Sequence, residues 1–516
     1  MRQKRNTISS LQFLLNNDDG PRYKQLYLQV LEHIRQGRLR PADRLPGSRV
    51  LAESLGVSRS TVVNSYDRLI AEGILISKTK SGIFVSDDAS FLLQQNQKNE
   101  ARHVTPESNP RPERLNFNSG IDPLAFPQQA WLKSMRASWR TPDPMVLGDN
   151  CPTGLPALKQ AIADYLYQLR GLSCQPEQIL VTAGSRDALT LIHHTLEKTS
   201  EEVHWLCENP TYPPIRELIH GWKKPGQRLC QLEIDGEGCP TPDDVGLSGQ
   251  ISTASVLTPN RQYPTGGAMS NTRRQQWLSY LQAEQGWLIE DDYDNEFHYN
   301  GKSGIPLMQA DRSGRVLFVG SFSKVLFRGL RLGFIVAPKQ LYPLLQQTRH
   351  ELGGSAALPM QPVVAEFMKN GEFARHINRM RRHYRQKRDY LLYLCEQHLS
   401  PWFHWQQPQG GMHLLIFLKP WLINQFVTSN AALLQGKEGR KGPDQQISAA
   451  MRPYNIRMHP LSDHYATQSL TSGETTEYLT KNQGFVLGFT GPDEKTQQFI
   501  VKTLAETLSV FCPINI

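Results

Sequence analysis

The strongest constraint on the fold is a series of short apolar runs that alternate with amphipathic stretches from about residue 115 onward. Each run has the length of a β-strand, and near-continuous apolar strands separated by helices are typical of a mostly parallel sheet. The pattern therefore predicts an α/β domain. The runs are QILVTAG (178–184), VHWLCE (203–208), ASVLTP (254–259), WLIEDD (287–292) and RVLFVGS (315–321), and a long helical stretch follows near 372–399.

The first ninety residues follow a different pattern, which predicts three helices. Residues 22–36 place apolar side chains at helical spacing on one face. A second, shorter helix is expected over 48–56, with Ser48 as its N-cap. A third is expected over 58–73, with Ser58 as its N-cap.

A β-hairpin and a linker follow these helices. ILISKTKSGIFVS (74–86) alternates apolar and polar side chains around Lys80-Ser81-Gly82, which is typical of two strands joined by a turn. Three helices and a hairpin in this order predict a winged helix-turn-helix. A stretch rich in Gln, Asn, Pro and charge then favours a linker. The predicted parts are a winged helix-turn-helix over 15–88, a linker over 89–114 and the α/β domain over 115–516, with a large part at about 145–350 and a small part at about 351–516.

Net charge is +9 and is unevenly distributed. Residues 1–90 hold 14 Lys and Arg against 9 Asp and Glu, whereas the rest of the chain holds 43 against 39. A short basic segment on a nearly neutral body is typical of a module that binds a polyanion. The seven cysteines form no CxxC pair, which favours reduced thiols over disulfides or a metal site. With no membrane-length apolar run and no secretory signal, we expect a cytoplasmic protein that does not interact with membranes.

The third predicted helix has the features of a DNA-recognition helix. A helix-turn-helix places the start of its second helix in the major groove of double-stranded DNA, where arginine and hydroxyl side chains bond bases and phosphates. The alternative is a helical packing domain with an ordinary basic surface, but caps, turn, recognition helix and wing all fall in register. The predicted DNA contacts are Arg49, Ser58, Arg59, Ser60, Thr61, Lys78 and Lys80.

A single lysine, Lys324, lies in the stretch VGSFSKVLFRGLRLGF (319–334). Its neighbours suit a lysine that forms a Schiff base beside a bound phosphate, because burial among apolar groups favours the neutral, nucleophilic amine. Arg331 can bind the phosphate through two hydrogen bonds, and Ser321 and Ser323 can add neutral donors. From this stretch alone, an exposed lysine without a role is equally compatible.

Further motifs favour a site for pyridoxal 5'-phosphate (PLP). ILVTAGSRDALTLI (179–192) runs from a strand into a helix, and a helix N-terminus favours an anion. In WLIEDDYDNEF (287–297), Asp291 follows an apolar strand and can pair with a pyridinium nitrogen, while Tyr293 can reach the phenolic oxygen. ENPTYPP offers Tyr212 as a stacking platform. TPNRQYPTGG supplies a sharp turn with Asn260, Gln262 and Tyr263 near the edge of the ring.

Two resemblances rest on these motifs. RLPGSRVLAESLGVSRSTVVNSYDRLIAEGIL (44–75) resembles the GntR family of bacterial regulators. Residues 115–516 resemble the aminotransferase-like domain of the MocR subfamily of that family, which has the fold-type I fold of PLP-dependent aminotransferases (aspartate aminotransferase-like). The motifs that carry the second resemblance are LGDNCPTGLPALKQAIADYL, ILVTAGSRDAL, ENPTYP, TPNRQYPTGG, IEDDYDNEFHY and GSFSKVLFRGLRLGF.

The second resemblance implies a role for each matching residue. Lys324 is expected to form the internal aldimine with PLP, and Asp291 to pair with the pyridine nitrogen. Tyr293 is expected to bond the phenolic oxygen and Tyr212 to stack on the ring. Asn260 stands at the ring edge, in a turn that departs from the family's Ser-His-Gln. The implied phosphate ligands are Ser185, Arg186, Ser321, Ser323 and Arg331. The resemblance also implies a homodimer.

One residue expected of a working aminotransferase is missing. Enzymes of this fold anchor a substrate carboxylate with an arginine in a strand near the C-terminus, where GFVLGFT (484–490) has Val486. The first arginine after ENPTYPP is Arg216. A buried carboxylate without such a partner binds poorly, which argues against ordinary transamination of amino acids. The sequence gives no role to Arg328.

The leading interpretation is therefore a PLP-dependent transcriptional regulator with little or no turnover. It binds operator DNA and senses PLP or an amino compound as its effector. The alternative is an active PLP-dependent aminotransferase that carries a DNA-binding module. A third interpretation keeps the fold without the cofactor and leaves a protein that only binds DNA and dimerises.

Overall fold

The computed structural model separates the chain into two compact units, residues 1–113 and 114–516. It describes residues 13–16, 20–78, 81–89, 115–200, 203–222, 229–246, 252–301, 304–354, 356–429, 442–466 and 482–511. Lys80 and all of the predicted linker except its first residue lie outside the described residues.

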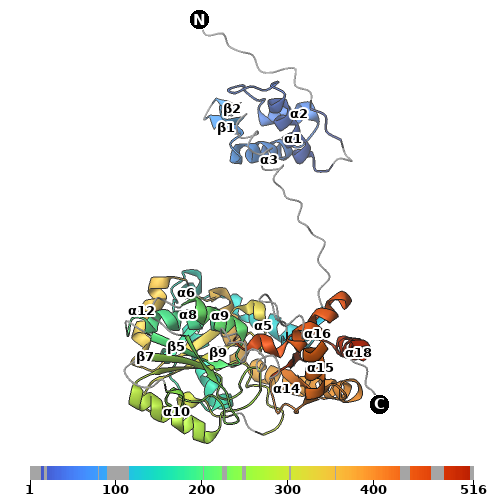
Figure 1. Ribbon diagram of the computed structural model, residues 1–516. Helices are drawn as coiled ribbons and strands as arrows, with labels where there is room; N and C mark the ends of the chain where they lie inside the picture. Colours follow the sequence, from blue (N-terminus) through green and yellow to red (C-terminus); the bar gives the residue numbers. More distant parts are fainter. Residues whose placement is uncertain are drawn as a thin grey trace. The chain divides into compact units, whose positions relative to one another are not determined.

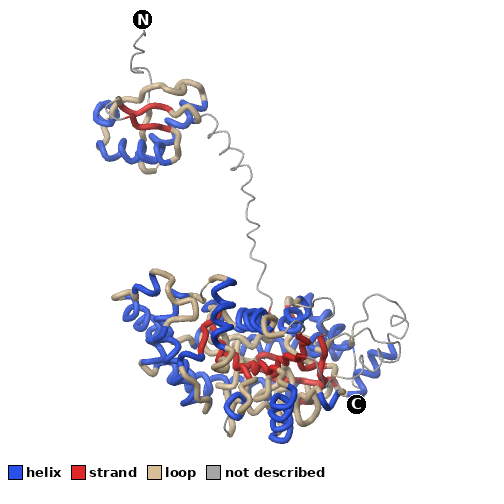
Figure 2. Tube along the Cα trace, turned by 90° about the vertical axis from the view of Figure 1, so that its left-hand side faces the viewer, coloured by secondary structure: helices blue, strands red, loops and turns tan. Residues whose placement is uncertain are grey.

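The first unit is a winged helix-turn-helix, as predicted (Figure 1; Figure 2). Its core is apolar and closed, with Leu26, Val30, Val62 and Leu69 buried completely between the helices. The hairpin pairs antiparallel, Leu75 opposite Val85. The elements are α1 (Arg22–Arg35), α2 (Ser48–Leu55), α3 (Arg59–Ala71), β1 (Leu75–Lys78) and β2 (Gly82–Val85).

The two predicted helix caps have different outcomes. Ser58 is the N-cap of α3, and its hydroxyl accepts a hydrogen bond from the Thr61 N–H at 3.2 Å. The prediction of Ser48 as the N-cap of α2 is wrong, because Gly47 takes the extended cap conformation and Ser48 is the first helical residue. The Ser48 hydroxyl instead accepts from the Arg59 side chain at 3.4 Å.

A mostly parallel sheet forms the centre of the second unit, as predicted. Its strand order is β4-β10-β9-β8-β7-β5-β6, and only β10 runs antiparallel to its neighbours. All five apolar runs of the sequence form strands of this sheet. They are β4 (Ile179–Thr182), β5 (Val203–Asn209), β7 (Ser252–Leu257), β8 (Trp287–Asp292) and β9 (Val316–Ser321), joined by β6 (Leu229–Glu233) and β10 (Gly333–Val336).

Helices cover both faces of this sheet. Figure 1 shows α8, α9 and α12 on one side of the strands and α10 on the other. Leu317 and Val319 of β9 pack toward α8 and α12, whereas the intervening Phe318 packs toward the other face. The flanking helices are α5 (Gln128–Trp139), α6 (Pro144–Leu147), α7 (Pro156–Tyr165), α8 (Ser185–Leu196), α9 (Pro213–Gly221), α10 (Asn271–Glu284), α11 (Leu307–Ala310), α12 (Tyr342–Leu352) and α13 (Gln361–Lys369).

The C-terminal part of this unit has a smaller, antiparallel sheet of its own. It contains β11 (Phe403–Trp405), β12 (His413–Leu418) and β14 (Gly484–Gly488), in that order. A further pair, β3 (Leu115–Asn116) and β13 (Ile456–Arg457), joins the first described residues of the unit to this part. Its helices are α14 (Glu372–His398), α15 (Pro420–Ser429), α16 (Pro443–Met451) and α18 (Glu494–Phe511).

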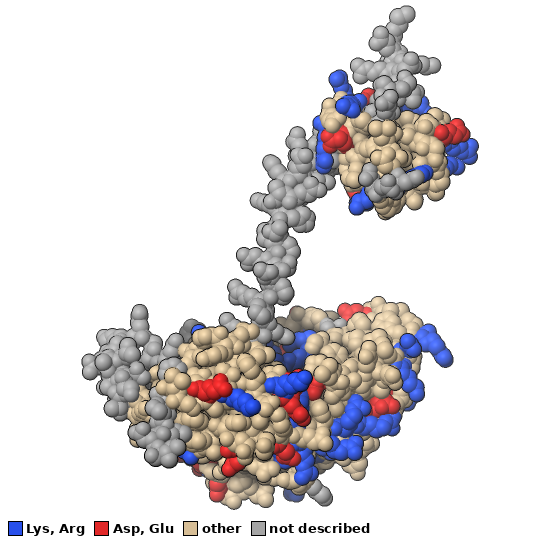
Figure 3. Space-filling view, turned by 90° about the vertical axis from the view of Figure 1, so that its right-hand side faces the viewer, with Lys and Arg blue, Asp and Glu red and all other residues tan. Residues whose placement is uncertain are grey.

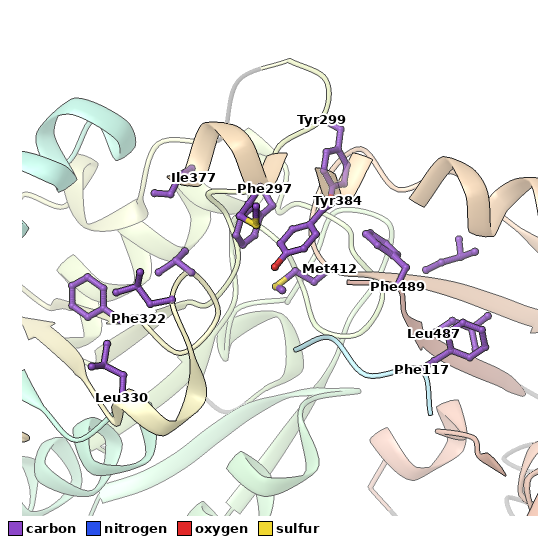
Figure 4. Close-up of a cluster of buried hydrophobic side chains, with 14 of the residues drawn as sticks. Phe117, Phe297, Tyr299, Phe322, Leu330, Ile377, Tyr384, Met412, Leu487 and Phe489 are labelled. Atoms are coloured by element: carbon purple, nitrogen blue, oxygen red, sulfur yellow. The ribbon is translucent and has the colours of Figure 1, made fainter. Parts of the chain in front are cut away.

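The two parts share one apolar core. Figure 4 shows Phe297 and Tyr299, which follow β8, beside Tyr384 of α14 and Met412, which precedes β12. Phe297 and Tyr384 meet edge to face, with ring centroids 5.1 Å apart. Among the described helices, none is long and apolar enough to cross a membrane.

The cap at Ser58 leads to a stability prediction for the first unit. Ser58→Ala removes the side-chain acceptor for the Thr61 N–H, and the loss of such a cap costs about 1 kcal/mol. Differential scanning calorimetry of the full chain should show the transition of the first unit at a lower temperature. Ser77→Ala, at an exposed serine of β1, is the control. Equal melting of both variants would contradict a stabilising cap.

Candidate functional site

Lys324, the residue predicted to bind the cofactor, lies three residues after β9. Its Nζ donates hydrogen bonds to the carbonyl oxygen of Ser119 at 2.9 Å and to the Ser119 hydroxyl at 3.1 Å. Burial lowers the pKa of Lys324 to about 8, and the charge of Arg328 acts in the same direction. Asp294 and Asp291 oppose that shift. A usable fraction of neutral, nucleophilic amine is therefore present near neutral pH.

The predicted phosphate residues lie at one edge of the sheet. Gly333 of β10 pairs with Thr182 of β4 on one side and with Ser321 of β9 on the other. Ser185, the first residue of α8, follows Thr182 by three positions, and Arg331 precedes Gly333 by two. This register brings the helix N-terminus, a hydroxyl and a guanidinium to the same edge.

At this edge the backbones of β9, β10 and the segment before α8 pack closely together. A Cβ at Gly333 would lie 2.9 Å from the Gly320 carbonyl oxygen and 3.0 Å from the Gly184 Cα, so no side chain fits there. Arg331 is exposed and has a left-handed backbone, with φ +49°. The Ser323 N–H donates to the Ser321 hydroxyl at 3.2 Å, and Arg186 is exposed on α8.

Asp291 and Tyr293 present buried polar groups that lack partners. Asp291 is only 7% exposed, and its side-chain carboxyl makes no hydrogen bond within the part of the chain that the structure describes. Burial raises the pKa of Asp291 to about 7, with the nearby charges of Asp292, Glu208 and Asp294 adding to the shift. The Tyr293 hydroxyl is buried and has no partner among the described residues. Such groups are costly unless a ligand satisfies them.

A cluster of aromatic rings lies beside these groups. Tyr212 is 44% exposed, at the start of α9, and its ring meets Tyr263 edge to face at 5.5 Å. The Tyr263 ring also contacts Tyr293 at 5.7 Å, His413 at 5.2 Å and His464 at 5.4 Å. Tyr263 is thus the centre of the cluster.

The amides of Asn260 and Gln262 are used inside the protein. Asn260 donates to Glu290 at 3.1 Å and accepts from Arg274 at 2.7 Å. Gln262 donates to the Pro210 carbonyl at 2.7 Å, and its own side-chain oxygen accepts from Thr265. The ring-edge roles expected of Asn260 and Gln262 would therefore require these bonds to be given up.

Sequence reasoning did not find several residues that shape the site. Ser119 lies 205 positions before Lys324 and belongs to no recognisable local motif. Arg170, 3% exposed, holds Asp292 at the end of β8 through bonds of 2.8 and 2.9 Å. The other residues are Arg328, His413 and His464, of which only Arg328, four residues from Lys324, stood inside a quoted motif.

The predicted DNA contacts gather on the first unit where α2 and α3 begin. Ser58, Arg59 and Ser60 are exposed at the start of α3, with Thr61 partly covered, and Arg49 is exposed in α2. The Arg59–Ser48 hydrogen bond joins the two helix starts. Lys78 lies on β1, with its ammonium over the ring of Phe84 at 5.1 Å. Figure 3 shows lysine and arginine side chains spread over the visible face of this unit.

Comparison with known proteins gives matches for both units. The model for bacterial regulatory proteins of the gntR family matches residues 22–85, and that for aminotransferase class I and II matches residues 150–438. The probable rhizopine catabolism regulatory protein MocR of Rhizobium meliloti is 31% identical, over 94% of this chain and 93% of its own. The pyridoxine biosynthesis transcriptional regulator PdxR of Corynebacterium glutamicum is 30% identical, over 94% and 96%.

Solved structures agree with the fold of the second unit. An archaeal alanine:glyoxylate aminotransferase matches with a TM-score of 0.63 at 22% identity, over 80% of this chain and 93% of its own. A kynurenine aminotransferase of Pyrococcus horikoshii matches with a TM-score of 0.62 at 19% identity, over 82% and 95%. At this identity the likeness concerns the fold alone, and it confirms the predicted aminotransferase fold.

The charge of Arg328 gives a prediction about the reactivity of Lys324. Arg328→Gln removes a cation that disfavours the charged amine, so the pKa of Lys324 should rise above about 8. The rate at which the protein incorporates added PLP can be measured by absorbance at a series of pH values. In Arg328→Gln this rate should reach half of its maximum at a higher pH than in the wild type. The change should stay below about one pH unit because solvent screens an exposed guanidinium. Arg312→Gln, at an exposed arginine, is the control, and an unchanged profile in Arg328→Gln would contradict this role.

Proposed function

Because the chain belongs to the MocR subfamily of the GntR family of bacterial regulators, we propose that it is a transcriptional regulator that binds PLP at Lys324 and responds to PLP or an amino compound. Its curated relatives include regulators with a helix-turn-helix and an aminotransferase-like domain. The observation that carries the proposal is the convergence of a lysine of lowered pKa with an unpartnered carboxyl and an unpartnered phenol.

The residues present fit PLP. The unpartnered Asp291 suits the ring nitrogen, and the unpartnered Tyr293 hydroxyl suits the phenolic oxygen. Tyr212, half exposed, would cover one face of the ring. A Cβ at Gly184 would meet nothing within 4 Å, so space is open at the start of α8, where backbone N–H groups and the helix dipole favour an anion. The residues that would hold it are Ser185, Arg186, Ser321, Ser323 and Arg331.

PLP, when bound, supplies an electrophilic carbonyl and an electron-withdrawing ring. The protein supplies a lysine amine that loses its proton easily, because burial and Arg328 disfavour the charged form. Asp291 would face the ring nitrogen, and a positive partner there would lower the pKa of its carboxyl and keep it ionised. Arg170 fixes the neighbouring Asp292, which holds the end of β8 in place.

Ser119 offers a route from the site to the rest of the chain. It follows β3 by three residues, and β3 begins one residue after the predicted linker. Condensation of the Lys324 amine with a carbonyl would leave its nitrogen with at most one hydrogen, so it could no longer donate to both oxygens of Ser119. Occupation of Lys324 therefore changes the bonding of the segment next to the linker, as ligand control of a two-state regulator requires.

Double-stranded DNA is the proposed partner of the first unit. The exposed residues at the start of α3 would contact this DNA. We further propose a homodimer located in the cytoplasm, with domain boundaries as the sequence predicts. An apolar wall at Val486, in place of an arginine, supports regulation over turnover.

Replacement of the lysine tests the cofactor. Lys324→Ala should abolish the visible absorption band of the protein incubated with PLP, at about 420 nm for a lysine-bound cofactor. It should also remove any effect of PLP on DNA binding. The exposed Lys339→Ala should keep both properties. An unchanged band in Lys324→Ala would reject the site, and robust multiple turnover of common amino donors by the wild type would establish the aminotransferase alternative.

Replacement of Arg59 tests DNA recognition. Arg59→Ala should weaken binding to the DNA upstream of the protein's own gene by about 5- to 150-fold, the range for one arginine–base contact. Exposed Arg38→Ala lies in the same unit, away from α3, and is the control. Equal loss in both variants, or binding that ignores DNA sequence, would contradict the assignment of α3 as the recognition helix.

A further inference from the structure

The ring cluster has a side that the predicted PLP residues do not use, formed by Tyr263, His413 and His464. We propose that these residues form the effector subsite, and that it takes an amine that carries hydroxyl groups and lacks a carboxylate. The proposal rests on the proposed function, since the effector's amine would act at the cofactor on Lys324.

The wall of the subsite is apolar where a carboxylate anchor would be expected. Val486 of β14 pairs directly with Leu415 of β12, and both pack with Leu461. All three side chains are apolar and buried. A carboxylate placed against this wall would lose its hydration without gaining a partner.

The strand face that carries this wall also packs against the segment bonded to Lys324. Side chains two residues apart lie on the same face of a strand, so His413 and Leu415 share a face of β12. Gly488 pairs with His413, and a Cβ at Gly488 would lie 2.2 Å from the backbone of Ser119. The segment that holds the lysine amine therefore packs directly on this face.

The two histidines present hydrogen-bond acceptors. His413 contacts the Pro264 carbonyl through Nε2 at 2.8 Å, so Nε2 must carry the proton. Its Nδ1 is buried without a partner among the described residues, which leaves a bare acceptor. His464 contacts the Pro460 carbonyl through Nδ1 at 3.1 Å, so Nδ1 carries the proton and Nε2 has the lone pair of an acceptor.

Both rings are neutral under ordinary conditions. Burial lowers the pKa of His413 to about 3 and that of His464 to about 4. The charged groups that face them are Arg261 and Lys324 at His413, and Asp463 at His464. Neutral acceptors attract hydroxyl donors and repel the lone pairs of a carboxylate.

Of the three arginines near the subsite, two are already bound inside the protein and the third is exposed to solvent. Arg216 donates to the backbone carbonyls of His464 at 2.9 Å and Asp463 at 3.1 Å, and so fixes the segment that carries His464. Arg261 is buried beside the Asp294 carboxylate at 3.5 Å. Arg328 is exposed, so solvent screens its charge, although that charge reaches both Tyr263 and Lys324.

Three amines with the same carbon skeleton distinguish the ligand classes. Serinol has two hydroxyls, serine has one hydroxyl and one carboxylate, and isopropylamine has neither. Calorimetric titration of the full-length, PLP-loaded protein should show serinol binding at least tenfold more tightly than serine and more tightly than isopropylamine. Tighter binding of serine than of serinol, above all if Arg328→Gln abolishes it, would overturn the proposal.

Two variants remove one acceptor each while keeping the structural bond. His464→Asn retains a donor near Pro460, and His413→Gln retains one near Pro264. Each should weaken serinol binding about three- to tenfold, as expected for one neutral hydrogen bond, and leave isopropylamine unchanged. His350→Gln, at an exposed histidine of α12, should change neither. Equal loss for serinol and isopropylamine would indicate a structural role and contradict the subsite.

The absorption spectrum separates this proposal from the one on which it rests. If the protein shows no cofactor band with PLP, the proposed function fails. If the band forms and depends on Lys324, but the three amines bind alike or serine binds best, only the effector subsite is rejected.

Discussion

The two hydrogen bonds from the Lys324 amine to Ser119 are the interaction on which the rest of the site depends. They hold the Lys324 amine against the segment around Ser119, which lies close to the first described residue of the second unit. Gly488 permits this approach, because any side chain there would collide with Asn118 and Ser119. A substitution at Gly488 would therefore displace the partner of the lysine without touching the lysine itself.

The buried acids at the ends of β5 and β8 differ in whether the protein itself satisfies them. Glu208 accepts hydrogen bonds from Thr258, and Glu290 accepts from the backbone N–H groups of Leu307 and Met308. Asp292 is held by Arg170. Asp291 alone of these four buried carboxyls makes no hydrogen bond within the described residues. Asp294, the other buried acid that acts on Lys324, lies 3.5 Å from the Arg261 guanidinium, whereas Asp291 has no such cation among the described residues. This difference supports the proposed ligand-facing role of Asp291.

Local patterns were sufficient to predict the fold. The five apolar runs are strands, and the cap at Ser58 begins α3, because strand length and capping depend on neighbouring residues. Ser48 was misassigned because Gly47 and Ser48 both suit a helix start, and packing of Arg59 against Ser48 is not visible in the sequence. Motifs located Lys324 and Asp291, whereas the partnership with Ser119 depends on chain folding over 205 positions.

The bonding of Ser119 also limits how strongly the site can control DNA binding. A neutral hydrogen bond contributes about 0.5–1.5 kcal/mol net, so the two bonds of the deprotonated Lys324 amine together account for about 1–3 kcal/mol. That range equals a typical coupling energy between two sites and changes an affinity by about 5- to 150-fold. It is less than the roughly 5.5 kcal/mol needed to invert a two-state population from 1:99 to 99:1. If ligand occupation of Lys324 acts through Ser119 alone, it would change the DNA affinity by a limited factor and would not switch binding fully on or off. A ligand that releases the Lys324 amine would let both hydrogen bonds to Ser119 form again.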